Sequence, residues 1–218
     1  MLSRPRRRGT SLSYRAKRLL DLTLTVPAFI ISLPLQLAVA GLVKLSLGSP
    51  VLFYQDRPGR GGRPFAMRKF RSMRPVDPAM GWTTDETRMT RTGAFLRSTS
   101  LDELPTLWNV IKGDMSLVGP RPLLMEYLDE YTAEQARRME VAPGITGLAQ
   151  INGRNEQSWA SRFAYDLHYV DNCSLKLDIC IILRTVWTVL RREGINSKAH
   201  VTMPLYRANP ARPDANVG

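Results

Sequence analysis

Residues 22–43, with the sequence LTLTVPAFIISLPLQLAVAGLV, decide the architecture of this 218-residue chain because they contain no charged side chain and are mostly apolar. A helix of that length extends about 33 Å, which matches the roughly 30 Å thickness of the hydrocarbon core of a bilayer. A helix in a soluble core rarely needs so long an apolar run. The stretch therefore predicts that the chain associates with a membrane.

Basic residues crowd both ends of this apolar run. Residues 1–74 hold 15 of the 31 Lys and Arg but 2 of the 19 acids, whereas residues 75–218 hold 16 bases and 17 acids. The net charge of +12 thus belongs to the flanks of the run, which favours an anionic membrane surface as partner. No nucleic-acid recognition motif accompanies the charge, so nucleic acid is not an expected partner.

Two prolines, Pro27 and Pro34, interrupt the run. Each removes a backbone donor and disfavours helix in the residue before it. A helix that bends near Pro34 and leaves by the face it entered would explain the two basic flanks, while a kinked spanning helix is the alternative. The residue pattern leaves both open. Ser32 and Gln36 are expected to satisfy backbone groups that Pro34 frees.

The remainder, about 170 residues, is enough for one domain with a real core. Its two cysteines, Cys173 and Cys180, and two histidines do not have the spacing of a zinc site. This cysteine usage is typical of free thiols in a reducing, cytoplasmic-facing domain.

Short-range patterns predict an α+β, mostly helical fold. Residues 51–55 and 65–70 read as strands joined by dense turn chemistry, which indicates a hairpin. Helices are expected within 84–98, 101–111, 125–141 and 158–170. Residues 175–192 place apolar residues at helical spacing with charges between them, which favours a helix lying in the membrane plane over a packed core helix.

The densest motif is SLDELP at residues 100–105. Asp102 and Glu103 are adjacent carboxylates, and Pro105 is tolerated only in a first helical turn, so a helix should begin near Asp102. Ser100 and Glu103 match a capping box, and the pattern alone therefore favours helix caps. The Gly, Pro and basic residues around the pair favour a phosphate-handling site instead.

The chain resembles the monotopic phosphoglycosyl transferases, the bacterial sugar transferase family, along nearly its whole length. The resemblance rests on motifs in order: KRLLD (17–21), FYQDRPG (53–59), KFRSM (69–73), DELP (102–105), KGDMS (112–116), GPRP (119–122), PGITG (143–147) and QINGRN (150–155). It implies a basic segment at 1–16, a re-entrant membrane helix at 17–47, a catalytic domain at 48–204 and a tail at 205–218. The expected fold also includes interfacial amphipathic helices, of the kind that residues 175–192 indicate. The resemblance implies that the catalytic domain lies on the cytoplasmic face of the bacterial inner (plasma) membrane.

The resemblance implies transfer of a sugar phosphate from a UDP-sugar to undecaprenyl phosphate, with release of UMP. Asp102 then becomes the nucleophile that forms a covalent phosphosugar intermediate, with Mg²⁺ bound at the same carboxylate. Glu103 is expected to assist the metal or accept a proton. Arg121 and Arg154 are expected to bind phosphates of the substrate. Further expected substrate contacts are Lys69, Arg97, Lys112, Asn155 and Asp166. Lys17 and Arg18 are expected at the lipid phosphate.

Two questions stay open at this stage. A non-catalytic membrane-tethered scaffold of a glycan assembly complex is the alternative function, in which the acids at 102–103 are structural. Likeness through residues 194–202 suggests an N-acetylated amino sugar as substrate, while the oligomeric state is undetermined.

Overall fold

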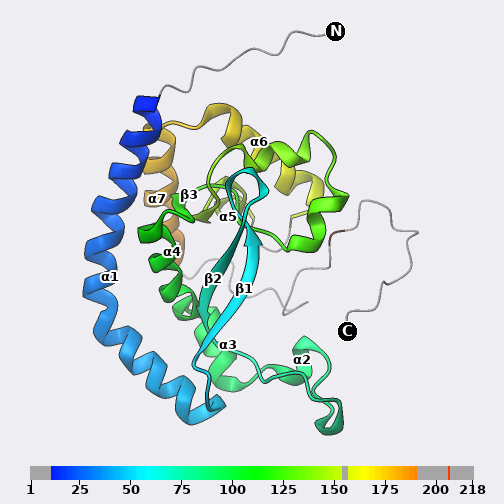
Figure 1. The fold of residues 1–218 in the computed structure, drawn as a ribbon. Helices are drawn as coiled ribbons and strands as arrows, with labels where there is room; N and C mark the ends of the chain where they lie inside the picture. The colour runs from blue at the N-terminus through cyan, green and yellow to red at the C-terminus, as the bar shows by residue number, and fades with distance from the viewer. Residues whose placement is uncertain (1–10, 154–156, 191–205, 207–218) are drawn as a thin grey trace.

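The computed structural model describes residues 11–153, 157–190 and 206 (Figure 1). Its α-helices are α1 Ser11–Leu47, α2 Asp85–Arg88, α3 Arg91–Ser98, α4 Leu107–Lys112, α5 Leu148–Ile151, α6 Trp159–Asn172 and α7 Leu175–Leu190. Its strands are β1 Leu52–Pro58, β2 Pro64–Phe70, β3 Ser116–Val118 and β4 Gly144–Thr146. Five 3₁₀ segments complete the set: η1 Arg60–Gly62, η2 Pro78–Met80, η3 Leu101–Thr106, η4 Met125–Glu130 and η5 Gln135–Glu140.

Helix α1 bends along one side of the molecule, with α4 and α7 beside it (Figure 1). Its apolar side chains face outward, with Ile31 78% and Leu37 73% exposed. It is the one helix among the described residues long and apolar enough to cross a membrane. A core helix would bury these residues, so their exposure favours a lipid environment for α1.

Ser32 and Gln36 form hydrogen bonds near Pro34, but they do not reach the backbone group that the proline frees. Ser32 Oγ donates to Phe29 O at 3.0 Å, and Gln36 Nε2 donates to Ser32 Oγ at 2.9 Å. The carbonyl that Pro34 leaves without its helical partner belongs to Ile30, four residues earlier. The two side chains therefore support the neighbouring carbonyl rather than the freed one.

Both ends of α1 contact the rest of the chain. Near its start, Lys17 Nζ lies 2.7 Å from Asp178 Oδ2 of α7, and Asp21 Oδ1 accepts from Ser116 Oγ at 3.0 Å. Near its end, Val39 and Val43 are buried in a cluster with Phe70 and Leu96. Apolar burial at one end and charged contacts at the other fix α1 to the domain.

Strands β1 and β2 form the expected hairpin, with register from Leu52↔Phe70 to Pro58↔Pro64. Because side chains alternate across a strand, Lys69 and Arg68 lie on opposite faces of β2. Residues 84–98 form α2 and α3, two short helices rather than one. The N-cap Thr90 side chain accepts from the Gly93 amide at 3.0 Å and begins the second helix.

The expected helix at 125–141 is wrong. The structure has η4 and η5 there, separated by extended backbone at Tyr131. Thr132 N donates to Gln135 Oε1 at 2.9 Å, while Gln135 N donates to Thr132 Oγ1 at 3.2 Å. This reciprocal cap starts a new turn and ends the continuity that the helical period suggested.

The sequence patterns missed a parallel pair, β3 and β4, with Ser116 opposite Gly144 and Val118 opposite Thr146. Three-residue strands carry too little alternation to be recognised. Gly119 follows β3 directly and lies against Gly144 of β4. A Cβ atom on Gly144 would lie 2.1 Å from the Gly119 amide nitrogen. The close approach of these backbones requires glycine and fixes the start of the segment that leads to Arg121.

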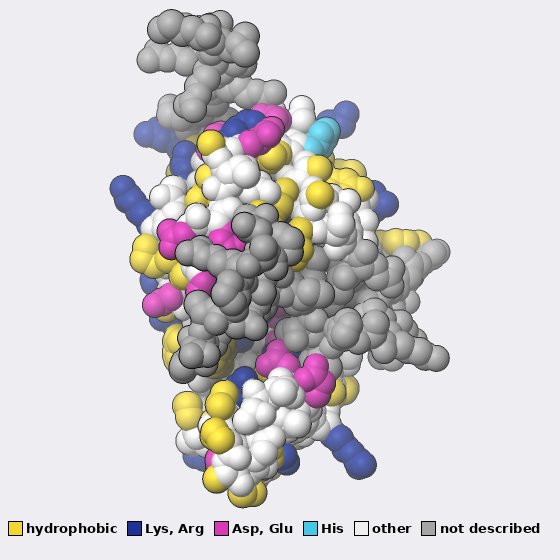
Figure 2. Space-filling view, turned by 90° about the vertical axis from the view of Figure 1, so that its right-hand side faces the viewer, with side chains coloured by type: hydrophobic (Ala, Val, Ile, Leu, Met, Phe, Trp, Pro, Cys, Tyr) yellow, Lys and Arg dark blue, Asp and Glu magenta, His cyan; other side chains and the backbone are white. Residues whose placement is uncertain are grey.

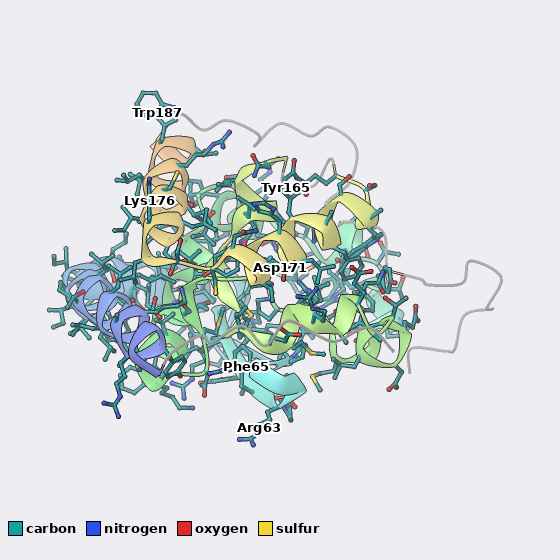
Figure 3. All side chains as sticks on the ribbon, turned by 90° about the horizontal axis from the view of Figure 1, so that it is seen from above. Arg63, Phe65, Tyr165, Asp171, Lys176 and Trp187 are labelled. Carbon is teal, nitrogen blue, oxygen red and sulfur yellow. The ribbon has the colours of Figure 1, made fainter. Side chains whose placement is uncertain are left out.

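Helix α7 is amphipathic. Asp178 and Ile181 are buried, whereas Ile179, Leu183 and Trp187 are exposed. Figure 3 shows Trp187 projecting from the outer side of α7. The side of the whole molecule that is turned away from α1 has a different surface, on which acidic, basic and apolar side chains are mixed (Figure 2). An inner face packed on the core and an outer apolar face are both present in α7, so its place in the membrane plane remains a prediction.

Candidate active site

Glu103 is held by two cations. Lys69 Nζ lies 2.7 Å from Glu103 Oε1, and Arg121 donates to the same oxygen and, at 3.4 Å, to Oε2. Burial alone would raise the pKa of the Glu103 carboxyl, but Arg121 and Lys69 hold it well below its usual range. Glu103 is therefore a permanent anion that fixes both cations.

Asp102 has a contrasting environment. It is 7% exposed, and its carboxylate makes no hydrogen bond or ion pair with another of the described residues. Burial, followed by the charge of Glu103, raises the pKa of Asp102 to about 6, against the smaller opposing effects of Lys69, Arg97 and Arg121. The carboxylate is ionised at neutral pH, poorly solvated and uncommitted, as a nucleophile must be.

The capping hypothesis for this motif is wrong. Ser100 has a φ of 57°, in the left-handed region, and its side chain caps no amide of η3. For a residue other than glycine this conformation costs free energy, and such residues gather at functional sites. The Glu103 side chain points to Lys69 and Arg121 instead of back to the Ser100 amide.

Two fully buried polar residues dock η3 and α4 onto the hairpin. Thr106 Oγ1 donates to Arg68 O at 2.9 Å. The Asn109 side chain accepts from Arg68 N at 3.1 Å and donates to Ala66 O at 2.8 Å. These bonds set the position of β2 against the end of η3 and against α4, and thereby help to place Lys69 opposite Glu103.

Arg121 is supported from behind by a buried ion pair. Arg138 donates to Arg121 O at 2.8 Å and to Asp166 Oδ2 at 2.6 Å. Burial raises the pKa of Asp166 in spite of Arg138. The expected substrate residue Asp166 is 2% exposed, and the structure thus places it behind Arg121, with Arg138 as its partner.

The other expected substrate-binding residues either bond to protein groups or lie outside the described residues. Arg97 lies near enough to lower the pKa of Asp102, while its guanidinium donates to Ser72 Oγ at 3.0 Å. Lys112 is half exposed and pairs with Asp114 at 3.1 Å, away from the acid pair. Arg154 and Asn155 lie outside the described residues.

Lys17 and Arg18, expected at the lipid phosphate, contact protein groups. Lys17 pairs with Asp178 and also donates to Val118 O at 3.0 Å, and Arg18 donates to Ile111 O at 2.6 Å and to Val110 O. The Arg18 contacts lie at the end of α4, where a cation stabilises the last carbonyls. Binding of lipid phosphate by either residue remains a prediction.

A small depression is connected to the acid pair through Arg121, the partner of Glu103. Arg121, Arg138, Ala149, Gln150, Arg162 and Asp166 line it. Gln150 Oε1 is buried, and no donor of the described residues reaches it. Three guanidinium groups and one carboxylate line this depression, and Gln150 adds an acceptor. That combination suits an anion that also carries a hydroxyl or N–H donor.

Comparison with known proteins decides the family. The model of the family described as bacterial sugar transferase matches residues 12–192. The chain belongs to the bacterial sugar transferase family. It is 52% identical over 187 residues to the uncharacterized sugar transferase EpsL of Bacillus subtilis, covering 85% of this chain and 93% of that protein.

Two further relatives carry a named reaction. The UDP-glucose:undecaprenyl-phosphate glucose-1-phosphate transferase of Xanthomonas campestris is 46% identical over 190 residues, covering 82% of this chain and 39% of that protein. The undecaprenyl-phosphate galactose phosphotransferase of Salmonella typhimurium is 39% identical over 197 residues, covering 82% of this chain and 41% of that protein. This sugar transferase is accordingly a phosphoglycosyl transferase.

Arg138 and Arg162 were missed from the sequence of this transferase. Both lie in segments that read as ordinary charged helix, in which an arginine is typical of a solvated face. One signal was available for Arg138, because an arginine that is buried requires a buried acid, and Asp166 was already a candidate.

The donor set bears on the expected magnesium. No group of three His, Cys, Asp or Glu that could hold a metal converges among the residues described. Glu103 is committed to its cations, which leaves Asp102 as the available carboxylate. Mg²⁺ keeps several waters and is bound through one or two carboxylates plus substrate phosphates, so these residues fit an ion that arrives with the substrate.

Proposed function

We propose that this transferase moves a sugar phosphate from a UDP-sugar to undecaprenyl phosphate through a covalent intermediate on Asp102, with release of UMP. The observation that carries the proposal is the asymmetry of the acid pair. Glu103 is saturated by Lys69 and Arg121, whereas Asp102 is buried beside it without a partner among the described residues. A structural acid would be paired, because an uncompensated buried carboxylate is costly.

The first step is attack by an Asp102 carboxylate oxygen on the β-phosphorus of the UDP-sugar. A bond forms between that oxygen and phosphorus, while the bond from phosphorus to the bridging oxygen breaks and UMP leaves with the electron pair. In the second step a phosphate oxygen of undecaprenyl phosphate attacks the same phosphorus and the Asp102 carboxylate leaves. Two displacements by similar nucleophiles replace one exchange between two bound anions.

Lys69 and Arg121 serve both steps. Their two positive charges balance the carboxylates of Glu103 and the ionised Asp102, so when Asp102 bonds to phosphorus one unit of positive charge becomes available to the transferred phosphoryl group. We propose that the nucleotide diphosphate binds at Arg121 and in the depression beside it. Mg²⁺, when bound with the substrate, would offset repulsion between the diphosphate and Asp102.

The structure supports a re-entrant α1. Its start contacts α7 through Lys17 and the hairpin loop through Tyr14, whose ring lies 5.0 Å from the Arg60 guanidinium carbon. Its end packs through Val39 and Val43 on the same domain. A straight spanning helix would separate its ends by the bilayer, about 30 Å. We therefore propose that both ends lie at the cytoplasmic face of a bacterial inner membrane.

The sugar is the least constrained part. The two relatives with named reactions act on glucose and galactose, and the segment 194–202 that suggested an N-acetylated amino sugar lies outside the described residues. Gln150 Oε1, which no donor of the described residues reaches, would accept equally from a hydroxyl or an acetamido N–H. An N-acetylated amino sugar remains the proposal.

The decisive experiment measures UMP release by the full chain in nanodiscs with Mg²⁺ and a panel of UDP-sugars, first without acceptor. We expect a burst of about one UMP per enzyme and a gain in protein mass equal to one sugar phosphate, followed by turnover when undecaprenyl phosphate is added. UMP release that strictly requires the acceptor, with no adduct on the protein, would replace the covalent route by direct transfer. No release from any UDP-sugar would favour a scaffold.

A further inference from the structure

The hairpin carries a second feature on the face opposite Lys69. Arg68 lies across from Tyr54 in the strand register. The Arg68 guanidinium carbon lies 5.9 Å from the Tyr54 ring centre and 5.9 Å from that of Trp108 in α4. The Trp108 ring in turn lies 5.8 Å from the Phe29 ring in α1. Tyr54, Arg68, Trp108 and Phe29 form a continuous row, which we call the aromatic row, from the hairpin to the apolar helix.

The rings of this row are not core residues. Tyr54 is 53% exposed and Trp108 is 38% exposed, although a folded domain gains by burying rings of this size. Tyr and Trp combine an apolar ring with a polar tip, and this property enriches them at the boundary between membrane and water. The contact between Trp108 and Phe29 places the row beside the apolar run of α1.

Arg68 lacks the acidic partner that its neighbour has. Lys69 is paired with Glu103, but no carboxylate of the described residues lies within ion-pair distance of Arg68. Asp56, which shares its face of the hairpin, makes no ion pair with it. Tyr54 and Trp108 hold the guanidinium from its sides by cation–π contacts and thereby leave its N–H groups for an external anion.

We propose that the aromatic row is a membrane-interface site at which Arg68 binds the phosphate of an anionic phospholipid headgroup while the Tyr54 and Trp108 rings lie among the headgroups. The site rests on the immersion of α1 proposed above. Guanidinium binds phosphate through paired N–H groups, and the aliphatic stem of arginine tolerates an apolar surround. Because Lys69 projects from the other face of the same strand, this contact would fix the height of Lys69 and Glu103 above the bilayer.

The test uses Trp108 as a reporter in nanodiscs of phosphatidylcholine, alone or mixed with phosphatidylglycerol, with bromine on the acyl chains of either lipid. The reporter chain carries Trp82→Phe, Trp159→Phe and Trp187→Phe. If that chain does not fold, the quenching of Trp108 is obtained as the difference in fluorescence between the native protein and Trp108→Phe, each measured with and without brominated lipid. We expect quenching strongest for bromine near the headgroup, and stronger for brominated phosphatidylglycerol.

Arg68→Gln should reduce the preference for phosphatidylglycerol over phosphatidylcholine about fivefold, as expected for one basic contact worth roughly 1 kcal/mol. Arg63→Gln is the matched control. Arg63 lies on the same hairpin, is exposed and projects outward at its far end (Figure 3), so the preference should not change.

Three outcomes overturn the proposal. If Trp108 is not quenched while a tryptophan at Ile31→Trp in α1 is, the row lies outside the interface and the proposed function stands. If neither is quenched, the immersion of α1 fails too. If inorganic phosphate in phosphatidylcholine nanodiscs changes Trp108 fluorescence as phosphatidylglycerol does, with the change lost in Arg68→Gln, the site takes a soluble anion instead.

Discussion

Two polar clusters in this transferase each combine a lysine with a buried carboxylate, and they differ in completeness. The anchor cluster joins Lys17 of α1, Asp178 of α7 and Tyr169 of α6, and every polar side-chain group in it has a partner: Tyr169 donates to Asp178 Oδ1 at 2.6 Å, and Lys17 bonds to Asp178 Oδ2. The active-site cluster joins Lys69, Arg121, Glu103 and Asp102, and in the part of the chain that the structure describes Asp102 has no hydrogen-bond or ion-pair partner.

The difference separates a structural role from a functional one. Buried polar groups are normally hydrogen-bonded, so a saturated cluster needs no explanation beyond stability. A carboxylate that is buried and unpaired opposes folding and persists only where function requires it. Changes in the active-site cluster should thus reduce activity, and changes in the anchor cluster should reduce stability.

The largest expected effect follows from Asp102→Asn. An amide cannot form the acyl phosphate bond, so the burst of UMP should disappear and turnover should fall at least about a thousandfold. Asp129→Asn is the matched control, because Asp129 is exposed and also belongs to an adjacent acid pair. Normal turnover by Asp102→Asn would contradict the assignment of a catalytic role to the active-site cluster.

The next effect is on stability. Asp178→Asn leaves Lys17 without its counter-ion in a largely buried site and should lower the free energy of unfolding by about 3 kcal/mol, measured by denaturant titration in detergent. Turnover per folded molecule should be unchanged. Adding Lys17→Met should restore part of the loss, because the unpaired lysine charge is then removed. If the double variant is less stable than the single one, the cluster is not a pairwise anchor.

A smaller effect is expected from Glu103→Gln. The change removes the negative charge that helps to raise the pKa of Asp102, so the acidic limb of the pH–rate profile should move to lower pH. Lys69 and Arg121 lose their common partner, and turnover should fall about tenfold to a hundredfold. A loss as large as that of Asp102→Asn, with the limb unmoved, would make Glu103 a direct participant in the chemistry.

Sequence reasoning reached the hairpin, the long apolar helix and the acid pair because each depends on local chemistry: turn residues, an uncharged run and adjacent carboxylates. The local pattern alone favoured helix caps for the pair, since Ser100 and Glu103 match a capping box that the left-handed Ser100 backbone prevents, and the resemblance to the family pointed to catalysis instead. It missed β3 and β4 because their pairing joins residues far apart in the chain. It assigned Lys17 to lipid because its acid, Asp178, lies 161 residues away.

The smallest effect tests the electrostatics of Asp102 in the folded protein. Its folded pKa of about 6 lies above its ordinary value of 3.8, so the ionised carboxylate opposes folding above pH 6, and this cost is lost as the pH falls from about 6 towards 3.8. Lowering the pH from 7.5 to 5 should therefore stabilise the native protein by about 1.4 kcal/mol relative to Asp102→Asn. Other acids titrate equally in both proteins, so thermal unfolding of the pair at the two pH values isolates this carboxylate. Parallel pH dependence of the two melting temperatures would mean that Asp102 is as well solvated as a surface acid, and the contrast between the two clusters would be lost.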